Sequence, residues 1–204
     1  MSKDKYSRRR LPKKELRDKV LIMCSGETEE IYFNHFKNKG KLNNVSIKVA
    51  IHKKGNLKAV VKAALMQKPD YDEIWAVFDK DDFLDFDEAI RLAEDGGIQC
   101  AFSNEAFEYW FLLHFESKTR TGAISRDKLN YELGKHLGYD YDKKAETIRR
   151  VCDRISGRLA SAEEKARAGY EWHKCNSGHK PSMWCSCTTV NVLTKRLREW
   201  GNAK

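Results

Sequence analysis

The stretch Ile74-Trp-Ala-Val-Phe-Asp-Lys-Asp-Asp82 contains five consecutive apolar residues followed by three carboxylates. Such an apolar run predicts a strand buried on both faces, as in the middle of a parallel sheet. In open α/β sheets, ligands bind just beyond the carboxyl ends of the strands. Asp79 and Asp81 can share a Mg²⁺ or Mn²⁺ ion there, because both ions prefer oxygen ligands. The stretch therefore predicts metal-dependent phosphoryl chemistry.

Strands and helices are expected to alternate around this stretch. Apolar runs predict strands at 20–24, 45–51, 74–78 and 98–102. Periodic apolar residues predict helices at 28–39, 87–94 and 107–115, and one more that is capped by Asn56 and ended by Pro69. This alternation predicts an α/β fold, with a mainly parallel sheet flanked by helices.

The second half of the chain gives mostly helical signals. Helices are predicted at Lys128–His136, at Lys143–Arg167 and from Thr188 onward, with an irregular segment at Tyr170–Cys187. We therefore divide the chain into a basic N-terminal arm (1–19), an α/β core (20–116) and a mainly helical part packed on that core (117–204).

Composition limits the class of protein. The chain has 204 residues, a net charge of +9 and 41% apolar residues, and no apolar run reaches the roughly 20 residues of a membrane span. No apolar segment follows the first residues, so no secretory signal is expected. Six scattered cysteines without a disulfide-framework spacing are typical of a reducing compartment. We expect a cytoplasmic protein that does not bind membranes.

The N-terminal arm is strongly basic. Residues 1–19 hold nine Lys or Arg against three Asp or Glu. A basic arm beside a metal site suits a polyanionic substrate such as DNA or RNA, because each phosphate contact adds attraction that does not depend on base sequence. The residues expected to bind the nucleic acid are Arg8, Arg9, Arg10, Lys13 and Lys14. The alternative is a solvated terminus without a ligand.

Other interpretations of the acidic stretch were weighed. A calcium loop of the EF-hand type requires an oxygen ligand and a glycine where Phe83 and Leu84 stand, and a final glutamate where Ile90 stands. That interpretation is excluded. A phosphatase of the haloacid-dehalogenase type also uses Asp-x-Asp, but on its first strand. The third alternative is that Asp79–Asp82 simply end a strand, although three adjacent carboxylates repel one another without a cation.

Three blocks of the sequence carry a family resemblance. They are residues 20–33 (VLIMCSGETEEIYF), 73–82 (EIWAVFDKDD) and 103–115 (SNEAFEYWFLLHF). An acidic loop after the first strand and Asp-x-Asp after the third are similar to the Toprim fold of topoisomerases, primases and OLD-family nucleases. The blocks together resemble the RloB family of Toprim-like proteins. Pro181-Ser182 and residues 187–193 (CTTVNVL) resemble the C-terminal block of that family.

The resemblance implies a Mg²⁺-dependent nuclease of bacterial phage defence that works with an ABC-type ATPase partner. It places metal ligands at Asp79 and Asp81. The family's glutamate before Gly26 is replaced by Ser25 in this chain. Glu29 or Glu27 would then supply the missing carboxylate as ligand or base. Ser25 equally favours an alternative function, a degenerate Toprim-like subunit that docks the ATPase or nucleic acid without cutting.

Two of these acidic residues have structural alternatives. Glu108 would complete a second metal site and allow in-line displacement with two ions. Its alternative is a capping or salt-bridging role, since a glutamate on so apolar a helix needs a partner. For Glu29 the alternative is favourable charge at a helix N-terminus. His114, at the end of the same apolar helix as Glu108, is expected to be packed rather than to act as a base.

A second constellation lies at residues 173–187. His173, Cys175, His179, Cys185 and Cys187 offer sulfur and imidazole ligands for a structural Zn²⁺ ion. The segment has no Cys-x-x-Cys pair, and the alternative is ordinary thiols of a cytoplasmic protein. Tyr170, Trp172 and Trp184 are expected to pack this segment onto the core, or else to stack on bases.

Overall fold

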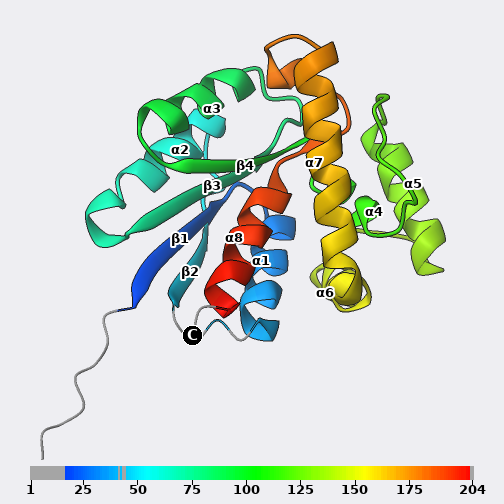
Figure 1. Cartoon of the computed structure of the whole chain (residues 1–204), viewed down its shortest axis with the longest axis horizontal. Coiled ribbons are helices and arrows are strands. Elements are labelled where there is room, and N and C mark those ends of the chain that lie inside the picture. Colours follow the sequence, from blue (N-terminus) through cyan, green and yellow to red (C-terminus); the bar gives the residue numbers. More distant parts are fainter. Residues whose placement is uncertain (1–16, 41, 43–44, 203–204) are drawn as a thin grey trace, which may run out of the picture.

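A five-stranded sheet forms the centre of the computed structural model, which describes residues 17–40, 42 and 45–202 (Figure 1). The strand order is β2-β1-β3-β4-β5. The first four strands are parallel, and β5 pairs antiparallel with the end of β4. The strands are β1 Asp18–Cys24, β2 Val45–Ile51, β3 Glu73–Asp79, β4 Gln99–Asn104 and β5 Cys187–Thr188. The predicted α/β class with a mainly parallel sheet is confirmed.

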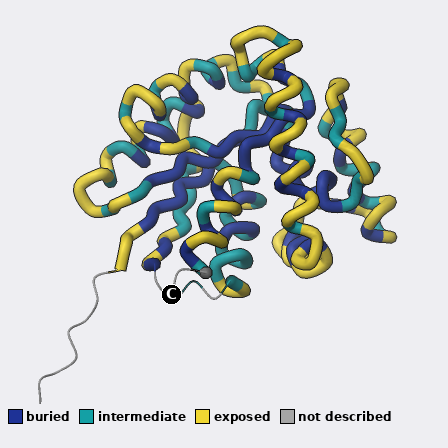
Figure 2. The backbone as a smooth tube through the Cα atoms, viewed as in Figure 1, coloured by how far each residue is buried: buried dark blue, intermediate teal, exposed yellow. Residues whose placement is uncertain are grey.

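The apolar run at Ile74–Phe78 is buried along its whole length because β3 lies between β1 and β4. Figure 2 shows these central strands as a continuous buried band. Alternate residues of each strand contact opposite faces of the sheet. Val20, Ile22 and Val77 belong to the core on one face, whereas Leu21 and Phe78 belong to the core on the other. A two-sided core fixes the register of both strands.

The helices cover both faces of the sheet (Figure 1). Helices α2 and α3 pack on one face, and α1, α4 and α8 contribute to the core on the other. Asn56 caps α2 as predicted, accepting a hydrogen bond from the amide of Ala59 (3.1 Å). The helices are α1 Glu27–Lys39, α2 Leu57–Leu65, α3 Phe86–Asp95, α4 Glu108–Leu113, α5 Arg126–Leu137, α6 Ala145–Ile155, α7 Leu159–Asn176 and α8 Val190–Asn202.

The predicted single helix at Lys143–Arg167 is wrong. Helix α6 ends at Ile155, a 3₁₀ turn follows at Ser156–Arg158, and α7 begins at Leu159. The break separates two packing partners, since α6 lies against α1 whereas α7 lies against α8. The Ser156-Gly157 pair at this point is a local turn signal that the prediction did not use.

The predicted irregular segment at Tyr170–Cys187 is wrong at both ends. Helix α7 continues to Asn176 because small residues and a buried histidine form one helical stripe: Ala162, Ala166, Gly169 and His173. Cys187 and Thr188 form β5 and extend the sheet. The C-terminal part of the chain therefore contributes a strand to the same sheet as residues 18–104.

The two sequence blocks at 103–115 and 181–193 meet at β4. The Oγ of Ser103 lies 3.0 Å from the Oγ1 of Thr188. The side-chain amide of Asn104 donates to the carbonyl oxygens of Pro181 (3.1 Å) and Ser182 (3.0 Å). The polar residues that begin the third block thus attach the C-terminal segment to the carboxyl end of β4.

Candidate functional site

A cavity of about 300 Å³ opens beyond the carboxyl ends of β1 and β3. The turn between β1 and α1 forms one part of it, and the loop between β2 and α2 forms another. Lys143, which lies two residues before α6, also lines the cavity. Its acidic lining residues are Glu27, Glu29, Asp79 and Asp81. The structure therefore brings four sequence-predicted site residues to one place.

Glu29 points back from the first turn of α1 toward the end of β1. Its Oε1 accepts a hydrogen bond from the Oγ of Ser25 (3.0 Å), and the side chain is buried. A Cβ added to Gly26 would lie 2.6 Å from the Oε2 of Glu29, so a larger residue there would require this carboxylate to shift. Glu29 thus places a carboxylate beside the residue where the family resemblance expects one and where Ser25 stands.

Asp79 is the last residue of β3, and its Oδ1 is buried without a hydrogen-bond partner among the described residues. Burial raises the pKa of this carboxyl well above its usual range, and the charges of Glu29 and Glu108 raise it further. An unpaired buried oxygen is expensive in free energy. The position of Asp79 is therefore suited to a ligand that brings its own positive charge.

Glu108 lies in the first turn of α4 and is 1% exposed. Its Oε1 accepts a hydrogen bond from the hydroxyl of Tyr141 (3.0 Å), and its Oε2 pairs with the ammonium of Lys143 (3.1 Å). The charge of Glu108 raises the pKa of both Glu29 and Asp79. Glu108 thus has the salt-bridging role that we weighed, and it still acts electrostatically on the cavity.

Glu29, Asp79 and Glu108 form one electrostatic group, which we call the carboxylate triad. Burial raises the pKa of Glu29 to about 7, and the charge of Glu108 adds to this, while the Ser25 hydrogen bond and Lys143 oppose it. Lys143 also lowers the pKa of Asp79. One ammonium is therefore shared by three carboxylates, and the group gains from an added cation.

Asp81 and Asp82 lie beyond the triad and have a cation of their own. Arg126, the first residue of α5, pairs with Asp81 through Nη1 and with Asp82 through Nη2 (2.8 Å). Asp81 adopts a positive φ of 43°, and its Oδ1 also accepts the amide of Asp82 (2.8 Å). Asp79 and Asp81 line one cavity but have different partners, so a shared metal ion stays a prediction.

Glu27 is the first residue of α1 and is exposed. It pairs with Lys53 in the loop between β2 and α2, and this cation lowers the pKa of the Glu27 carboxyl. Glu29 and Glu27 were the two candidates to supply the carboxylate that is missing at Ser25. Glu29 is buried within the triad, whereas Glu27 lies at the rim of the cavity.

The donor set was compared with what Mg²⁺ or Mn²⁺ requires. No group of three or more His, Cys, Asp or Glu side chains in the described part of the chain forms a ready-made metal site. Mg²⁺ commonly binds one or two carboxylates and completes its shell with water and substrate phosphate. The unpaired Oδ1 of Asp79 and the adjoining cavity fit that mode of binding, but not an all-protein cage.

The zinc expectation finds no assembled ligand set among the described residues. Cys175 lies on the exposed face of α7, whereas Cys187 is buried in β5, so different elements hold them apart. His173 bonds to the Oγ of Ser177 (2.9 Å) through Nδ1 and stacks on Trp184. Zinc bound by Cys175, His179, Cys185 and Cys187 therefore stays an unsupported prediction. Aromatic packing and the Asn104 hydrogen bonds hold this segment instead.

The remaining predicted residues have other positions. Arg8, Arg9, Arg10, Lys13 and Lys14 lie outside the described residues. His114 is buried, bonds to the carbonyl oxygen of Trp110 (2.9 Å), and has its pKa lowered to about 4 by burial, which fits a packed side chain. The sequence analysis did not identify the residues that bring positive charge to the site, which are Lys53, Arg126 and Lys143. It also did not identify Tyr141, which bonds to Glu108.

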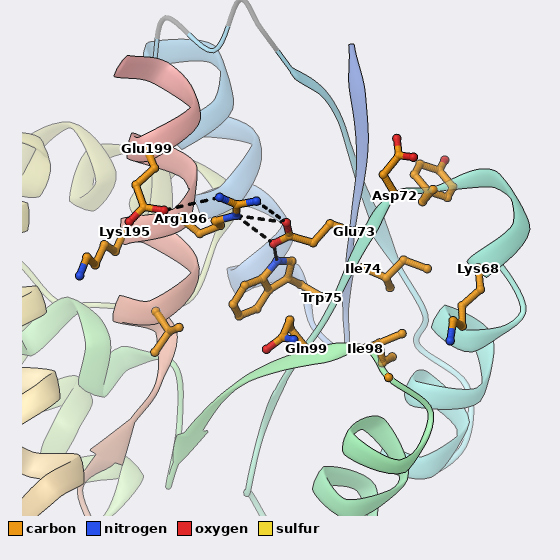
Figure 3. A pocket seen from close by; sticks show the side chains of 13 residues that line it. Lys68, Asp72, Glu73, Ile74, Trp75, Ile98, Gln99, Lys195, Arg196 and Glu199 are labelled. Atoms are coloured by element: carbon orange, nitrogen blue, oxygen red, sulfur yellow. Dashed lines mark hydrogen bonds and ion pairs between the residues drawn. The ribbon is translucent and has the colours of Figure 1, made fainter. Parts of the chain in front are cut away.

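A second hollow of about 570 Å³ lies at the other end of the strands (Figure 3). Its central acidic residue, Glu73, accepts hydrogen bonds from the guanidinium of Arg196 (2.9 Å) and the indole of Trp75 (2.8 Å). Arg196 also pairs with Glu199 (3.6 Å). These carboxylates have a cation and hydrogen bonds of their own. They therefore differ from the triad, in which the carboxylates disfavour one another's charged forms.

Comparison with known proteins identifies the family. A family model described as RloB-like protein matches residues 20–197. The match covers most of the chain, so the protein belongs to the RloB-like family, and the resemblance carried by the three sequence blocks is confirmed. No curated protein matches the chain, and no solved structure matches it. Within the described residues, no helix is both long and apolar enough to cross a membrane.

Proposed function

We propose that this RloB-like protein is a metal-dependent nuclease of the Toprim type that cleaves a phosphodiester bond of DNA or RNA. The observation that carries the proposal is the carboxylate triad beyond the ends of the parallel strands. Titratable groups with strongly shifted pKa values cluster at functional sites. Such groups cost folding free energy, and binding or catalysis makes use of them. In open α/β sheets this edge is also where ligands bind.

Asp79 and Glu29 would hold Mg²⁺ or Mn²⁺, with Asp81 as a further ligand once Arg126 releases it. Bound there, the ion would polarise the scissile phosphate and stabilise the charge that develops on it. Glu29 has a pKa near 7, which suits a residue that must both accept and release a proton at neutral pH. Lys143 pairs with Glu108 and partly offsets the negative charge of the cavity.

The biological setting rests on family membership. We propose that the protein acts in bacterial phage defence with an ABC-type ATPase partner, as the family resemblance implies. The sequence contains no P-loop motif for nucleotide binding, so an ATP-driven step would depend on that partner. We further propose cytoplasmic action, in keeping with the cysteine content.

A second candidate function is a non-catalytic subunit that docks the ATPase or nucleic acid. Two observations favour it. Ser25 replaces the carboxylate expected before Gly26, and Arg126 occupies Asp81. In such a subunit, the triad would be a remnant that costs stability and supports no cleavage.

Cleavage assays with matched variants separate the two functions. The purified chain, with its ATPase partner and Mg²⁺ or Mn²⁺, is incubated with labelled DNA and RNA beside Asp79→Asn and Glu29→Gln. Asp70→Asn, an exposed carboxylate at the opposite end of the strands, is the control. Loss of cleavage in the two triad variants alone supports the nuclease. Equal background in all four proteins, with nucleic-acid binding intact, favours the non-catalytic subunit.

A further inference from the structure

Three cation–carboxylate pairs surround the cavity. Lys143, which lines the cavity, pairs with the buried Glu108, Lys53 pairs with Glu27 at the rim, and Arg126 pairs with Asp81 and Asp82. Lys53 belongs to the loop after β2, whereas Arg126 contacts the loop after β3. Since β1 lies between β2 and β3 in the sheet, the two rim cations approach the cavity from different sides.

The three pairs differ in how much free energy is needed to separate them. Glu108 is 1% exposed, so removing its ammonium would leave a buried charge unpaired, which is strongly unfavourable. The side chains of Glu27, Asp81 and Asp82 are 64%, 40% and 90% exposed. Exposed pairs of this kind contribute little to stability, because water screens the charges. Lys53 and Arg126 can therefore leave their carboxylates for another anion, whereas Lys143 is held in place.

The backbone amides near the rim are already occupied. Asp85 accepts hydrogen bonds from the first amides of α2, those of Leu57 (3.4 Å) and Lys58 (2.9 Å). Lys58 itself pairs with Glu88 on α3. An anion that reaches the loop between β2 and α2 therefore meets the side chain of Lys53 before a free helix N-terminus. Gly55, with a φ of 86°, turns the chain between Lys53 and the start of α2.

We propose that Lys53 and Arg126 each bind one backbone phosphate of a nucleic-acid strand that crosses the cavity from the β2–α2 loop to α5. The proposal rests on the proposed function in taking nucleic acid as the ligand. In the free protein, Glu27 and the Asp81–Asp82 pair occupy the two phosphate positions. Binding exchanges each carboxylate for a phosphate, so the strand lies over the carboxylate triad. The contacts involve only the backbone, and both DNA and RNA fit them.

The test measures binding, not cleavage. A fluorescein-labelled single-stranded DNA and the RNA of the same sequence are titrated by anisotropy in EDTA across a series of salt concentrations. The proteins are the parent chain, Lys53→Gln, Arg126→Gln and the double variant. Each phosphate contact contributes about 0.7 to the slope of log affinity against log salt for single strands. Each single variant should lower the slope by about that amount, and the double variant by about twice as much.

Two controls remove the same charge at sites away from the cavity. Lys62→Gln changes an exposed lysine of α2 that does not line it. Arg150→Gln breaks an exposed arginine–glutamate pair on α6. Both should keep the parent slope. Equal slopes in all proteins, an equal fall in the controls, or absence of salt-dependent binding by the parent chain would overturn the proposal.

The outcome is distinguishable from failure of the nuclease. If the slopes fall as expected but no Asp79-dependent cleavage occurs, the phosphate positions stand and the proposed chemistry fails. If cleavage depends on Asp79 while Lys53→Gln and Arg126→Gln keep the parent slope, the nuclease stands and this assignment fails.

Discussion

The two ends of the parallel strands use the same residue types in opposite electrostatic states. At the amino ends, Arg196 pairs with Glu73 and Glu199, and the indole of Trp75 adds a hydrogen bond to Glu73 (Figure 3). At the carboxyl ends, the three carboxylates of the triad share Lys143, and one oxygen of Asp79 has no partner among the described residues. The first arrangement stabilises the fold, whereas in the second, burial and then mutual repulsion disfavour the charged carboxylates, an effect that a cationic ligand would offset.

We expect the largest effect from Asp79→Asn, which tests the difference between the two ends of the strands. We expect cleavage to fall by about 10³-fold, because the variant loses a metal ligand and the charge stabilisation that depends on it. The free energy of unfolding should not fall, because the neutral amide removes a buried charge from beside Glu29 and Glu108. Initial rates and urea denaturation check both. Glu73→Gln, at the amino ends, should keep full cleavage, and a similar loss there would contradict the assignment.

Lys143→Met should give the next largest effect, on stability. The variant leaves Glu108 buried without its cation, so we expect the free energy of unfolding to fall by about 3 kcal/mol. Arg196→Met removes the more exposed pair at the amino ends and should cost about 1 kcal/mol. The double variant Lys143→Met/Glu108→Gln should recover most of the loss. Equal costs for the two single variants would remove the distinction between the two ends.

The pH dependence of stability tests Glu29. Its pKa rises from 4.5 to about 7 on folding, so between these values the folded chain holds more protons than the unfolded chain. The free energy of unfolding should therefore fall as pH increases from about 4.5 to 7, by roughly 2–3 kcal/mol from this residue. Glu29→Gln should remove that part of the pH dependence. Denaturation at a series of pH values, parent minus variant, measures it, and a flat difference would contradict it.

The smallest expected effect comes from Ser25→Ala. Its hydroxyl donates to Glu29 and lowers the pKa of that carboxyl, so its loss should raise the pKa. We expect the pH midpoint of Mn²⁺ binding, measured by electron paramagnetic resonance, to move upward by up to about one unit. Ser46→Ala on the exposed side of β2 is the control. A downward shift would mean that Ser25 does not act on Glu29.

Local sequence patterns predicted much of the first hundred residues. The apolar run at 74–78, the cap at Asn56 and the strand at 20–24 all appear where expected. Prediction failed at Lys143–Arg167 and at Tyr170–Cys187. The break after Ile155 coincides with Ser156-Gly157, a local turn signal that the prediction did not use. The strand at Cys187 depends on pairing with β4, which is distant in sequence, and no local propensity reports such a partner.

The candidate site, too, could be predicted only in part from the sequence. Asp79 and Asp81 could be singled out because they follow a predicted strand, and the family resemblance then pointed to Glu29 and Glu108. Their charge partners, Lys143, Lys53 and Arg126, could not, because each comes from a different connection of the fold.

By itself, therefore, the sequence determined the α/β class and the edge of the sheet at which the carboxylates meet. Apolar periodicity and the order of the elements along the chain settle both of these. Only the tertiary structure decided that three of the carboxylates share one ammonium while Asp81 has an arginine of its own. Burial and distance set the strength of a charge interaction, and both arise when remote segments pack together.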